Sequence, residues 1–340
     1  MDLIERIGRD GHESVVFVSD PASGYRGIIA IHSTRRGPAL GGTRLWNYDN
    51  GDQAINDALR LSEGMTYKAA ASGMPWGGGK SVIIANPAKI DRKKIFQAHG
   101  RAVEKLGGQY ITSVDIGTGP DDMVFVKEET THVGGLPAPF GSPSPATARG
   151  VQRAIEAALL EVCGTADAAG RTVAIQGVGN VGYGLARGLH DVGAKLVVSD
   201  VDPARAKRVA DEFDARVVPV DQIHAEKVDV FAPCAFGAGL SETTIPQLRC
   251  GIIAGAANNQ LATAADAKRL ADRGIAYAPD FIANAGGLIY LGQEVLGWTA
   301  EQTMAKVDNI FETVREVFQR ASKHNVTTAE AAVSLAKERL

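Results

Sequence analysis

The hydrophobic pattern in the first part of the chain predicts a small domain of interleaved strands and helices. Short apolar runs bounded by turn residues predict strands over residues 15–18, 25–31, 81–85 and 109–113. Apolar residues spaced three or four positions apart predict helices over residues 52–67, 91–106 and 121–129. The stretch 36–44 is rich in glycine and predicts a loop. Together these elements indicate an α/β domain.

The pattern becomes more regular after residue 171, where strands and helices alternate. Apolar runs predict strands over residues 172–176, 195–200, 216–220, 228–232, 250–254 and 275–278. This alternation is typical of a doubly wound parallel sheet, the Rossmann architecture. Four prolines over residues 137–145 predict the domain boundary. We therefore expect one domain over 1–143 and a second over 144–321, with a final helix over 322–340 that packs back on the first.

Composition narrows the class of protein without identifying its chemistry. The chain has 340 residues, 45% of them hydrophobic, and a net charge of −3, which gives no electrostatic reason to expect nucleic acid or an anionic membrane. No signal peptide pattern opens the sequence, and no apolar run approaches the roughly 20 residues of a membrane span. Cys163, Cys234 and Cys250 form neither an even set nor a CxxC pair, which predicts a reduced, cytoplasmic location. No HExxH occurs, and no metal site is predicted.

A candidate dinucleotide site follows the strand predicted at 172–176. The GxGxxG pattern comprises Gly177, Val178, Gly179, Asn180, Val181 and Gly182. Alone this pattern is weak, but here a strand precedes it, a helix follows, and Asp200 ends the next strand near the expected spacing of about 20 residues. The glycines would let the backbone approach a pyrophosphate at a helix N-terminus. Asp200 would accept hydrogen bonds from ribose hydroxyls and repel a 2′-phosphate, which favours NAD, although Arg205 and Arg208 leave NADP open.

A pair of lysines, Lys68 and Lys80, forms the second candidate site. Three glycines, residues 77–79, directly precede Lys80, and such a run allows the close backbone approaches that a Cβ forbids. We therefore expect the Lys80 ammonium in a tight, partly desolvated place. A phosphate-binding P-loop is excluded, because its GxxxxGK spacing requires glycine where this chain has Met74, and because a strand rather than a helix is predicted next.

Several long motifs occur in order along nearly the whole chain. They are GPALGGTR at 37–44, MTYKAAASGMPWGGGKS at 65–81, ITSVDIGT at 111–118, SPSPATARGV at 142–151, GVGNVG at 177–182, FAPCAFGA at 231–238, AGAANNQL at 254–261 and APDFIANAGGLI at 278–289. In these motifs the chain resembles the glutamate/leucine/phenylalanine/valine dehydrogenase family, and in particular its leucine- and tryptophan-oxidising members.

The resemblance implies a substrate domain, a Rossmann domain that binds NAD and a cleft between them. It also implies reversible oxidative deamination of an L-amino acid to a 2-oxo acid and ammonia, by an enzyme that forms dimers or octamers. On this basis Lys68 binds the substrate α-carboxylate, Lys80 is the catalytic base and Asp115 moves protons to and from the amino group. Burial near another cation would lower the pKa of Lys80 and favour its neutral form.

The resemblance also assigns further residues to the two sites. Thr147 and Asn258 contact the nicotinamide end of the cofactor, and Asn258 also lies near the substrate. Cys234 lines the cofactor cleft, unless it is only a small buried side chain at the end of a strand. The substrate side-chain site comprises Leu40, Gly41, Ser113, Leu288 and Leu291.

The side-chain site narrows the choice of amino acid. Glutamate-specific members carry a lysine immediately before the Gly-Gly-x-Arg motif, where this chain has Leu40. A buried unpaired carboxylate costs several kcal/mol or more, so glutamate is not expected. Bulky Leu40 and Leu288 favour leucine or valine, whereas tryptophan-oxidising relatives and the departure at Val114 keep aromatic amino acids open. Two other classes remain as alternatives: a 2-hydroxy acid dehydrogenase and a non-catalytic NAD-binding regulatory protein.

Overall fold

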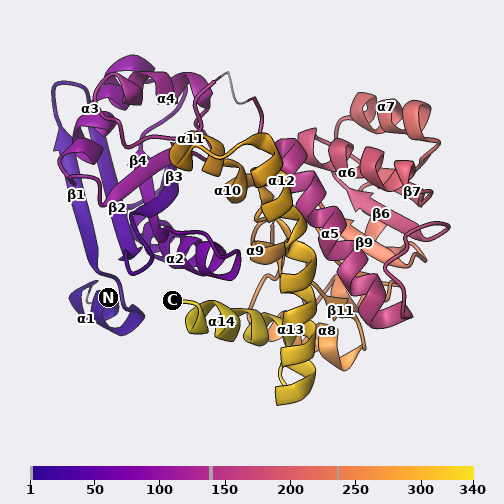
Figure 1. Cartoon of the computed structure of the whole chain (residues 1–340). Coiled ribbons are helices and arrows are strands. Elements are labelled where there is room, and N and C mark those ends of the chain that lie inside the picture. Colours follow the sequence, from indigo (N-terminus) through magenta and orange to yellow (C-terminus); the bar gives the residue numbers. More distant parts are fainter. Residues whose placement is uncertain (1–2, 138–140, 236) are drawn as a thin grey trace. The chain divides into compact units, whose positions relative to one another are not determined.

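The structure, a computed structural model, describes residues 3–137, 141–235 and 237–340. The chain divides into two compact units, whose elements are labelled in Figure 1. The first unit takes in the chain up to Gly141 together with Gln293–Gly297 and Arg339–Leu340, and the second comprises Ser142–Gly292 and Trp298–Glu338. Residues 138–140 of the predicted boundary region, and Phe236 of the FAPCAFGA motif, lie outside the described residues.

The first unit is built on a five-stranded sheet of order β1-β2-β4-β3-β5. Its strands are β1 Ser14–Asp20, β2 Tyr25–Ser33, β3 Ala39–Trp46, β4 Gly77–Ile84 and β5 Tyr110–Val114, and its helices are α1 Leu3–Asp10, α2 Gly51–Ala71, α3 Arg92–Glu104 and α4 Pro120–Lys127. Strands β1, β2 and β4 pair antiparallel, whereas β3 runs parallel to both β4 and β5.

The two faces of this sheet bury alternate residues of the same strands. Val82 packs with Ala54 and Ala58 of α2, whereas its neighbour Ile83 packs in a separate cluster with Phe96 of α3. This alternation follows from the pleat of a strand, in which successive side chains point to opposite faces. Helix α2 therefore covers one face, and α3 and α4 cover the other.

Two sequence predictions about the glycine-rich stretches are wrong. Strand β3 takes in residues 39–44 of the predicted loop, and β4 begins at Gly77, so the glycine run lies in a strand. Helix α2 also continues to Ala71, which places Lys68 inside its last turn. Glycine is generally disfavoured in strands because it offers no side chain to pack. Here neighbouring backbone occupies that space: a Cβ on Gly41 would lie 1.7 Å from the carbonyl oxygen of Gly79.

The second unit contains the predicted doubly wound sheet, with six parallel strands in the order β11-β10-β9-β6-β7-β8. The strands are β6 Thr172–Gln176, β7 Lys195–Ser199, β8 Arg216–Val217, β9 Val230–Pro233, β10 Ile252–Ile253 and β11 Ala276–Tyr277. The order reverses between β6 and β9, which is where open parallel sheets bind dinucleotides. The fold class is confirmed, although β8, β10 and β11 are shorter than predicted.

Helices surround this sheet and continue to the end of the chain. They are α5 Ser144–Cys163, α6 Asn180–Asp191, α7 Pro203–Phe213, α8 Ala265–Asp272, α9 Asp280–Ala283, α10 Gly286–Tyr290, α12 Ala300–Asp308, α13 Ile310–His324 and α14 Thr328–Glu338, with 3₁₀ turns η1 Ile223–Ala225 and η2 Ile245–Gln247. The short helix α11 Gly292–Leu296 belongs, apart from Gly292, to the first unit. Helix α14, within residues 322–340, packs on α13 and β11 of the second unit. Only the last two residues belong to the first unit, where Arg339 donates a hydrogen bond to the Ala71 carbonyl.

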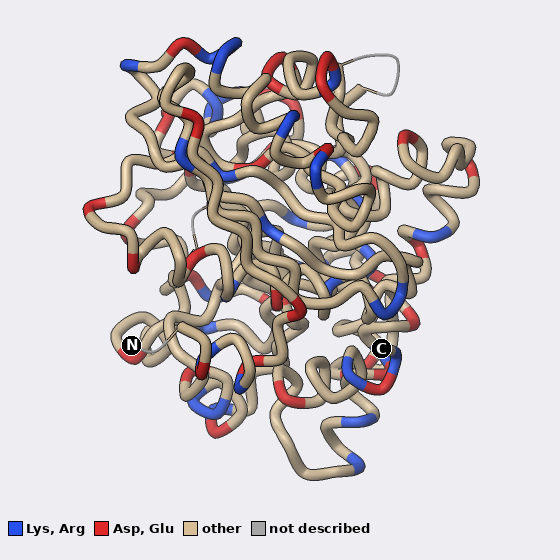
Figure 2. Tube along the Cα trace, turned by 90° about the vertical axis from the view of Figure 1, so that its left-hand side faces the viewer, with Lys and Arg blue, Asp and Glu red and all other residues tan. Residues whose placement is uncertain are grey.

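Other features of the sequence have simple structural counterparts. The three cysteines are free thiols, and Cys163 is exposed. No helix within the described ranges is both long and apolar enough to cross a bilayer. The same part of the chain holds no group of three or more His, Cys, Asp or Glu side chains suited to a metal ion. Figure 2 shows basic and acidic residues interspersed along the trace.

Candidate active site

The lysine site of the first unit lies on the face of the sheet that α2 covers. Strand register places Leu40 opposite Gly78 and Gly42 opposite Ser113, and residues paired in this way point to the same face. Lys80 lies two residues after Gly78 and therefore shares that face. The sheet thus gathers side chains from β3, β4 and β5, which are distant in sequence.

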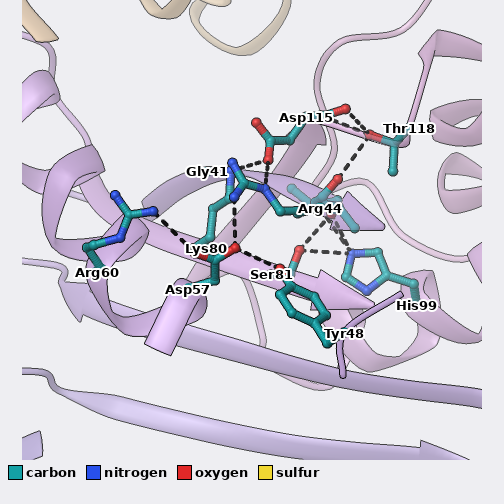
Figure 3. Close-up of polar contacts among 12 residues, drawn as sticks. Gly41, Arg44, Tyr48, Asp57, Arg60, Lys80, Ser81, His99, Asp115 and Thr118 are labelled. Atoms are coloured by element: carbon teal, nitrogen blue, oxygen red, sulfur yellow. Dashed lines mark hydrogen bonds and ion pairs between the residues drawn. The ribbon is translucent and has the colours of Figure 1, made fainter. Parts of the chain in front are cut away.

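The Lys80 amine forms an ion pair with the Asp115 carboxylate, and both residues are drawn in Figure 3. Its Nζ lies 2.9 Å from Oδ2 of Asp115, and the residue is 4% exposed. Burial lowers the pKa of Lys80, the nearby Arg44 cation lowers it further, and Asp115 opposes the shift without cancelling it. Burial raises the pKa of Asp115, but the charges of Lys80 and Arg44 outweigh burial and leave that pKa below its usual value. The site therefore combines an amine that tends toward its neutral form with an ionised carboxylate.

Arg44 links this pair to a second carboxylate on α2 (Figure 3). Its Nε lies 2.8 Å from Asp115 Oδ2, and its Nη1 lies 2.8 Å from Asp57 Oδ2. The Tyr48 hydroxyl donates to the same Asp57 oxygen at 2.8 Å, and Arg60 reaches the other oxygen at 3.2 Å. Arg44, Asp57 and Tyr48 were not predicted as site residues, because only the tertiary fold brings them to Lys80. The one signal in the sequence was that Arg44 ends the Gly-Gly-x-Arg motif.

The turn after β5 fixes the position of Asp115. The Asp115 backbone N–H donates to Thr118 Oγ1 at 2.8 Å, and that hydroxyl lies 3.0 Å from the Thr43 carbonyl oxygen. Gly117 has a φ of +81°, a left-handed conformation that favours glycine. A Cβ at Gly117 would also lie 2.1 Å from the Leu45 carbonyl oxygen. These contacts fix the backbone of the turn, and the fixed backbone in turn positions the Asp115 carboxylate.

The glycine run before Lys80 allows neighbouring segments to pack against β4. A Cβ on Gly78 would lie 2.1 Å from the backbone nitrogen of Thr66 in α2, and one on Gly79 would lie 2.7 Å from the Tyr110 ring. Real Cβ atoms do not approach so closely, so a side chain at either position would displace its neighbour. The glycines therefore account for the burial of Lys80, as the sequence suggested, within a strand.

The remaining predicted residues of the first unit lie on β3, β5 and α2. Leu40 is 1% exposed and Ser113 is 4% exposed, so both are core positions of the sheet. The Gly41 carbonyl oxygen accepts a 2.7 Å hydrogen bond from the Tyr110 hydroxyl. Lys68, in the last turn of α2, is half-buried.

The predicted dinucleotide loop joins β6 to α6 in the second unit. Gly177 has a φ of +89°, and a Cβ on Gly182 would lie 2.0 Å from the Gly177 carbonyl oxygen, so both positions require glycine. At Gly179 a Cβ would meet nothing nearer than Arg205 Nη1 at 3.8 Å. The Asp200 carboxylate accepts a hydrogen bond from the Val178 N–H at 2.8 Å and braces the loop.

A cavity of about 810 Å³ opens beside this loop, and Val178, Gly179, Asn180, Arg205 and Arg208 are among its lining residues. The open space at Gly179, the N-terminus of the 12-residue helix α6 and the two arginines suit the phosphates of a dinucleotide. The loop residues therefore fit NAD.

The other predicted cofactor residues lie outside that cavity lining. Thr147 Oγ1 donates to the Pro143 carbonyl within the first turns of α5. The Asn258 side-chain oxygen accepts a 2.8 Å hydrogen bond from Asn284. Cys234 directly follows β9, and burial raises the pKa of its thiol to about 12, so the thiol stays neutral.

The two predicted substrate residues of the second unit are both buried. Leu288 lies on α10 and is 6% exposed, and Leu291, at the end of α10, is 9% exposed.

Comparison with known proteins identifies the family. A model described as Glu/Leu/Phe/Val dehydrogenase, dimerisation domain, matches residues 12–132. A second, described as Glutamate/Leucine/Phenylalanine/Valine dehydrogenase, matches residues 142–204 and 202–340. The chain belongs to this family. It is an NAD-dependent amino acid dehydrogenase, as the motifs implied.

Relatives within the family act on different apolar amino acids. Leucine dehydrogenase from Bacillus subtilis is 45% identical over 100% of this chain and 94% of its own length. Phenylalanine dehydrogenase from Thermoactinomyces intermedius is 42% identical over 100% of this chain and 94% of its own length. The crystal structure of L-tryptophan dehydrogenase from Nostoc punctiforme has a TM-score of 0.89 at 43% identity, covering 99% of this chain and 98% of that one. The chain is therefore an amino acid dehydrogenase of the leucine, phenylalanine and tryptophan subgroup.

Proposed function

We propose that this protein catalyses reversible oxidative deamination of an apolar L-amino acid, leucine or valine, to the 2-oxo acid and ammonia, with Lys80 as the base. The observation that carries the proposal is the buried Lys80 amine, 2.9 Å from the Asp115 carboxylate. Burial lowers the pKa of the Lys80 amine, and this favours the neutral form that can accept a proton.

Each residue of the first unit then has a defined task. Lys68 binds the substrate α-carboxylate, and Asp115 carries protons to and from the amino group. NAD, when bound, would supply the acceptor for the hydride of the substrate Cα, and loss of this hydride would leave an iminium carbon on the substrate. Lys80 takes a proton from the water that attacks this carbon, and the carbinolamine collapses to the 2-oxo acid and ammonia.

We assign the cofactor to the loop of the second unit. The backbone of residues 177–182 and the N-terminus of α6 would hold the pyrophosphate. Each Asp200 oxygen accepts one backbone hydrogen bond, from Val178 or Asp202, and a carboxylate oxygen retains capacity for a second, from a ribose hydroxyl. We propose that Thr147 and Asn258 contact the nicotinamide end and that Cys234 lines the site.

The choice among apolar amino acids rests on the predicted side-chain residues. Leu40 is buried and apolar, so a glutamate side chain would lack a partner there. Bulky Leu40, Leu288 and Leu291 support a branched aliphatic substrate. An aromatic substrate is the second candidate, because the tryptophan and phenylalanine dehydrogenases match this chain almost as well as the leucine enzyme does.

A panel of L-amino acids assayed with NAD and with NADP at alkaline pH tests the proposal, through absorbance of the reduced cofactor. We expect the highest kcat/KM with leucine or valine and NAD. A higher value with phenylalanine or tryptophan would select the aromatic alternative, and no reduction with any amino acid would favour a non-catalytic NAD-binding protein. In the reverse direction, reduction that does not require ammonia would indicate a 2-hydroxy acid dehydrogenase.

The role of Lys80 has its own test in the Lys80→Ala variant. Loss of a general base lowers turnover by about 10²–10⁴-fold, and we expect a fall in kcat of that size. Lys105→Ala is the matched control, because Lys105 is exposed. Turnover of Lys80→Ala close to that of the parent enzyme would refute the assignment.

We also propose that copies of the chain associate through the first unit. The description of the family model that matches residues 12–132 names dimerisation. Strand β1 lies at the edge of its sheet, and its Phe17 is 54% exposed. Edge strands with exposed apolar side chains are common association surfaces. Light scattering on the purified protein would report a multiple of the 35.7 kDa chain mass, and a monomer at all concentrations would contradict the proposal.

A further inference from the structure

Arg44 is a permanent cation in direct contact with the Lys80–Asp115 pair. The guanidinium and the lysine amine share a single oxygen, Oδ2 of Asp115, at 2.8 Å and 2.9 Å. The Arg44 side chain is only 15% exposed, so solvent screens its charge weakly. A guanidinium stays protonated throughout the accessible pH range, so this charge does not vary with conditions.

An ion pair with Asp57 on α2 holds the Arg44 side chain in position. Its Nη1 contacts Asp57 Oδ2 at 2.8 Å, and the Tyr48 hydroxyl donates to the same oxygen at 2.8 Å. A guanidinium can contact two carboxylates through different nitrogens because its donors have a fixed planar geometry. An ammonium at this position could not reproduce both contacts. The Arg44 side chain therefore couples the charge of Asp57, on α2, to the Lys80 site.

We propose that Arg44 is a positioning residue for the reaction, which holds Asp115 as an oriented carboxylate and offsets its negative charge so that Lys80 remains a free base. This inference rests on the proposed function, in which Lys80 is the base. Without Arg44, the Asp115 carboxylate would stabilise the protonated Lys80, and the ion pair would hold the proton that the base must lose before it can act.

The charged groups that face Lys80 give the sign of each perturbation. They include Asp115 at the end of β5, Arg44 on β3 and Asp57 on α2, while Arg60 contacts Asp57. Removing the Arg44 cation raises the pKa of Lys80, because a repulsive charge is lost. Removing the Asp57 anion lowers the pKa of Lys80, because an attractive charge is lost. The two changes must therefore act in opposite directions.

The test is the pH profile of kcat/KM for the preferred amino acid in three variants of the full-length enzyme. In the profile, activity rises with pH along one limb. Arg44→Gln should shift this limb to higher pH by about one to two pH units. Arg44→Lys keeps the charge but loses the bridge, so its kcat should fall while the limb stays near that of the parent. Asp57→Asn should move the limb to lower pH. A purely structural role for Arg44 would lower activity without moving the limb.

A matched control and two outcomes make the test decisive. Arg101 also contacts two carboxylates, Asp20 and Glu129, each at 3.1 Å, but it lies on α3, so Arg101→Gln should leave the profile unchanged. If Lys80→Ala is inactive and the Arg44→Gln limb is not shifted, the inference fails while the proposed function stands. If Lys80→Ala retains turnover, the proposed function itself fails.

Should Arg44→Gln not fold, the Asp57→Asn profile decides. A shift of its limb to lower pH supports the inference, and no shift or an upward shift overturns it.

Discussion

The substitution Gly78→Ala tests whether the glycine run is needed for close packing around Lys80. The added methyl would lie 2.1 Å from the Thr66 backbone nitrogen and 2.5 Å from its Cα. These atoms belong to the backbone of α2 and cannot rotate away as a flexible side chain could. Helix α2 must therefore shift outward from β4 to admit the methyl.

The size of the effect follows from two opposing contributions. Overpacking a well-packed interior costs about 1–3 kcal/mol, and contact with fixed backbone places this site near the upper end. Replacing glycine in a strand recovers about 0.5–1 kcal/mol of conformational entropy. The net loss in the free energy of unfolding is then about 2 kcal/mol. For a unit of this size that corresponds to a fall in Tm of about 4–8 °C.

Urea unfolding followed by tryptophan fluorescence measures this loss, because Trp76 is 1% exposed and precedes the glycine run. The control is Gly64→Ala on α2, where an added Cβ would meet no atom within 4 Å. Alanine is the better helix former, so this control should gain about 1 kcal/mol. A midpoint for Gly78→Ala at or above that of the parent would refute the packing argument. So would equal losses in both variants, since they would indicate a general sensitivity of α2.

Two further predictions concern the two faces of the same sheet. Burial lowers the pKa of His99 to about 3 from an ordinary 6.5, so the folded protein favours the neutral ring. Its stabilising contribution is complete above pH 6.5 and is lost as the pH falls toward 3, by up to about 1.4 kcal/mol per pH unit. His99→Asn should flatten the dependence of unfolding free energy on pH in that range, and an equal effect of the exposed His324→Asn would contradict this. Leu40→Lys introduces a cation at a buried position, 1% exposed, on the other face. It should lower kcat/KM for leucine by about 100-fold or more, since a buried unpaired charge is costly, and raise the ratio of glutamate to leucine activity. An unchanged ratio in steady-state assays would show that Leu40 does not contact the substrate side chain.

The sequence by itself determined the features that are encoded by neighbouring residues. The strand before Gly177, the helix after it and the acidic Asp200 at the end of the next strand form one local unit, so their spacing predicted the dinucleotide loop and the doubly wound sheet. The glycines before Lys80 likewise indicated that its amine is buried, because glycine allows neighbouring backbone to approach closely.

The tertiary structure decided which elements those residues form and which charges meet. Glycine-rich segments predicted a loop at β3, but backbone from β4 fills the space beside Gly41, so the sheet overrides the local preference of glycine. Arg44 contacts both Asp57 and Asp115 only because β3 pairs parallel to β5 and α2 covers the sheet. The sequence separation of these residues gives no sign of that contact. The electrostatic environment of Lys80 is therefore a property of the sheet topology rather than of the motif that contains the lysine.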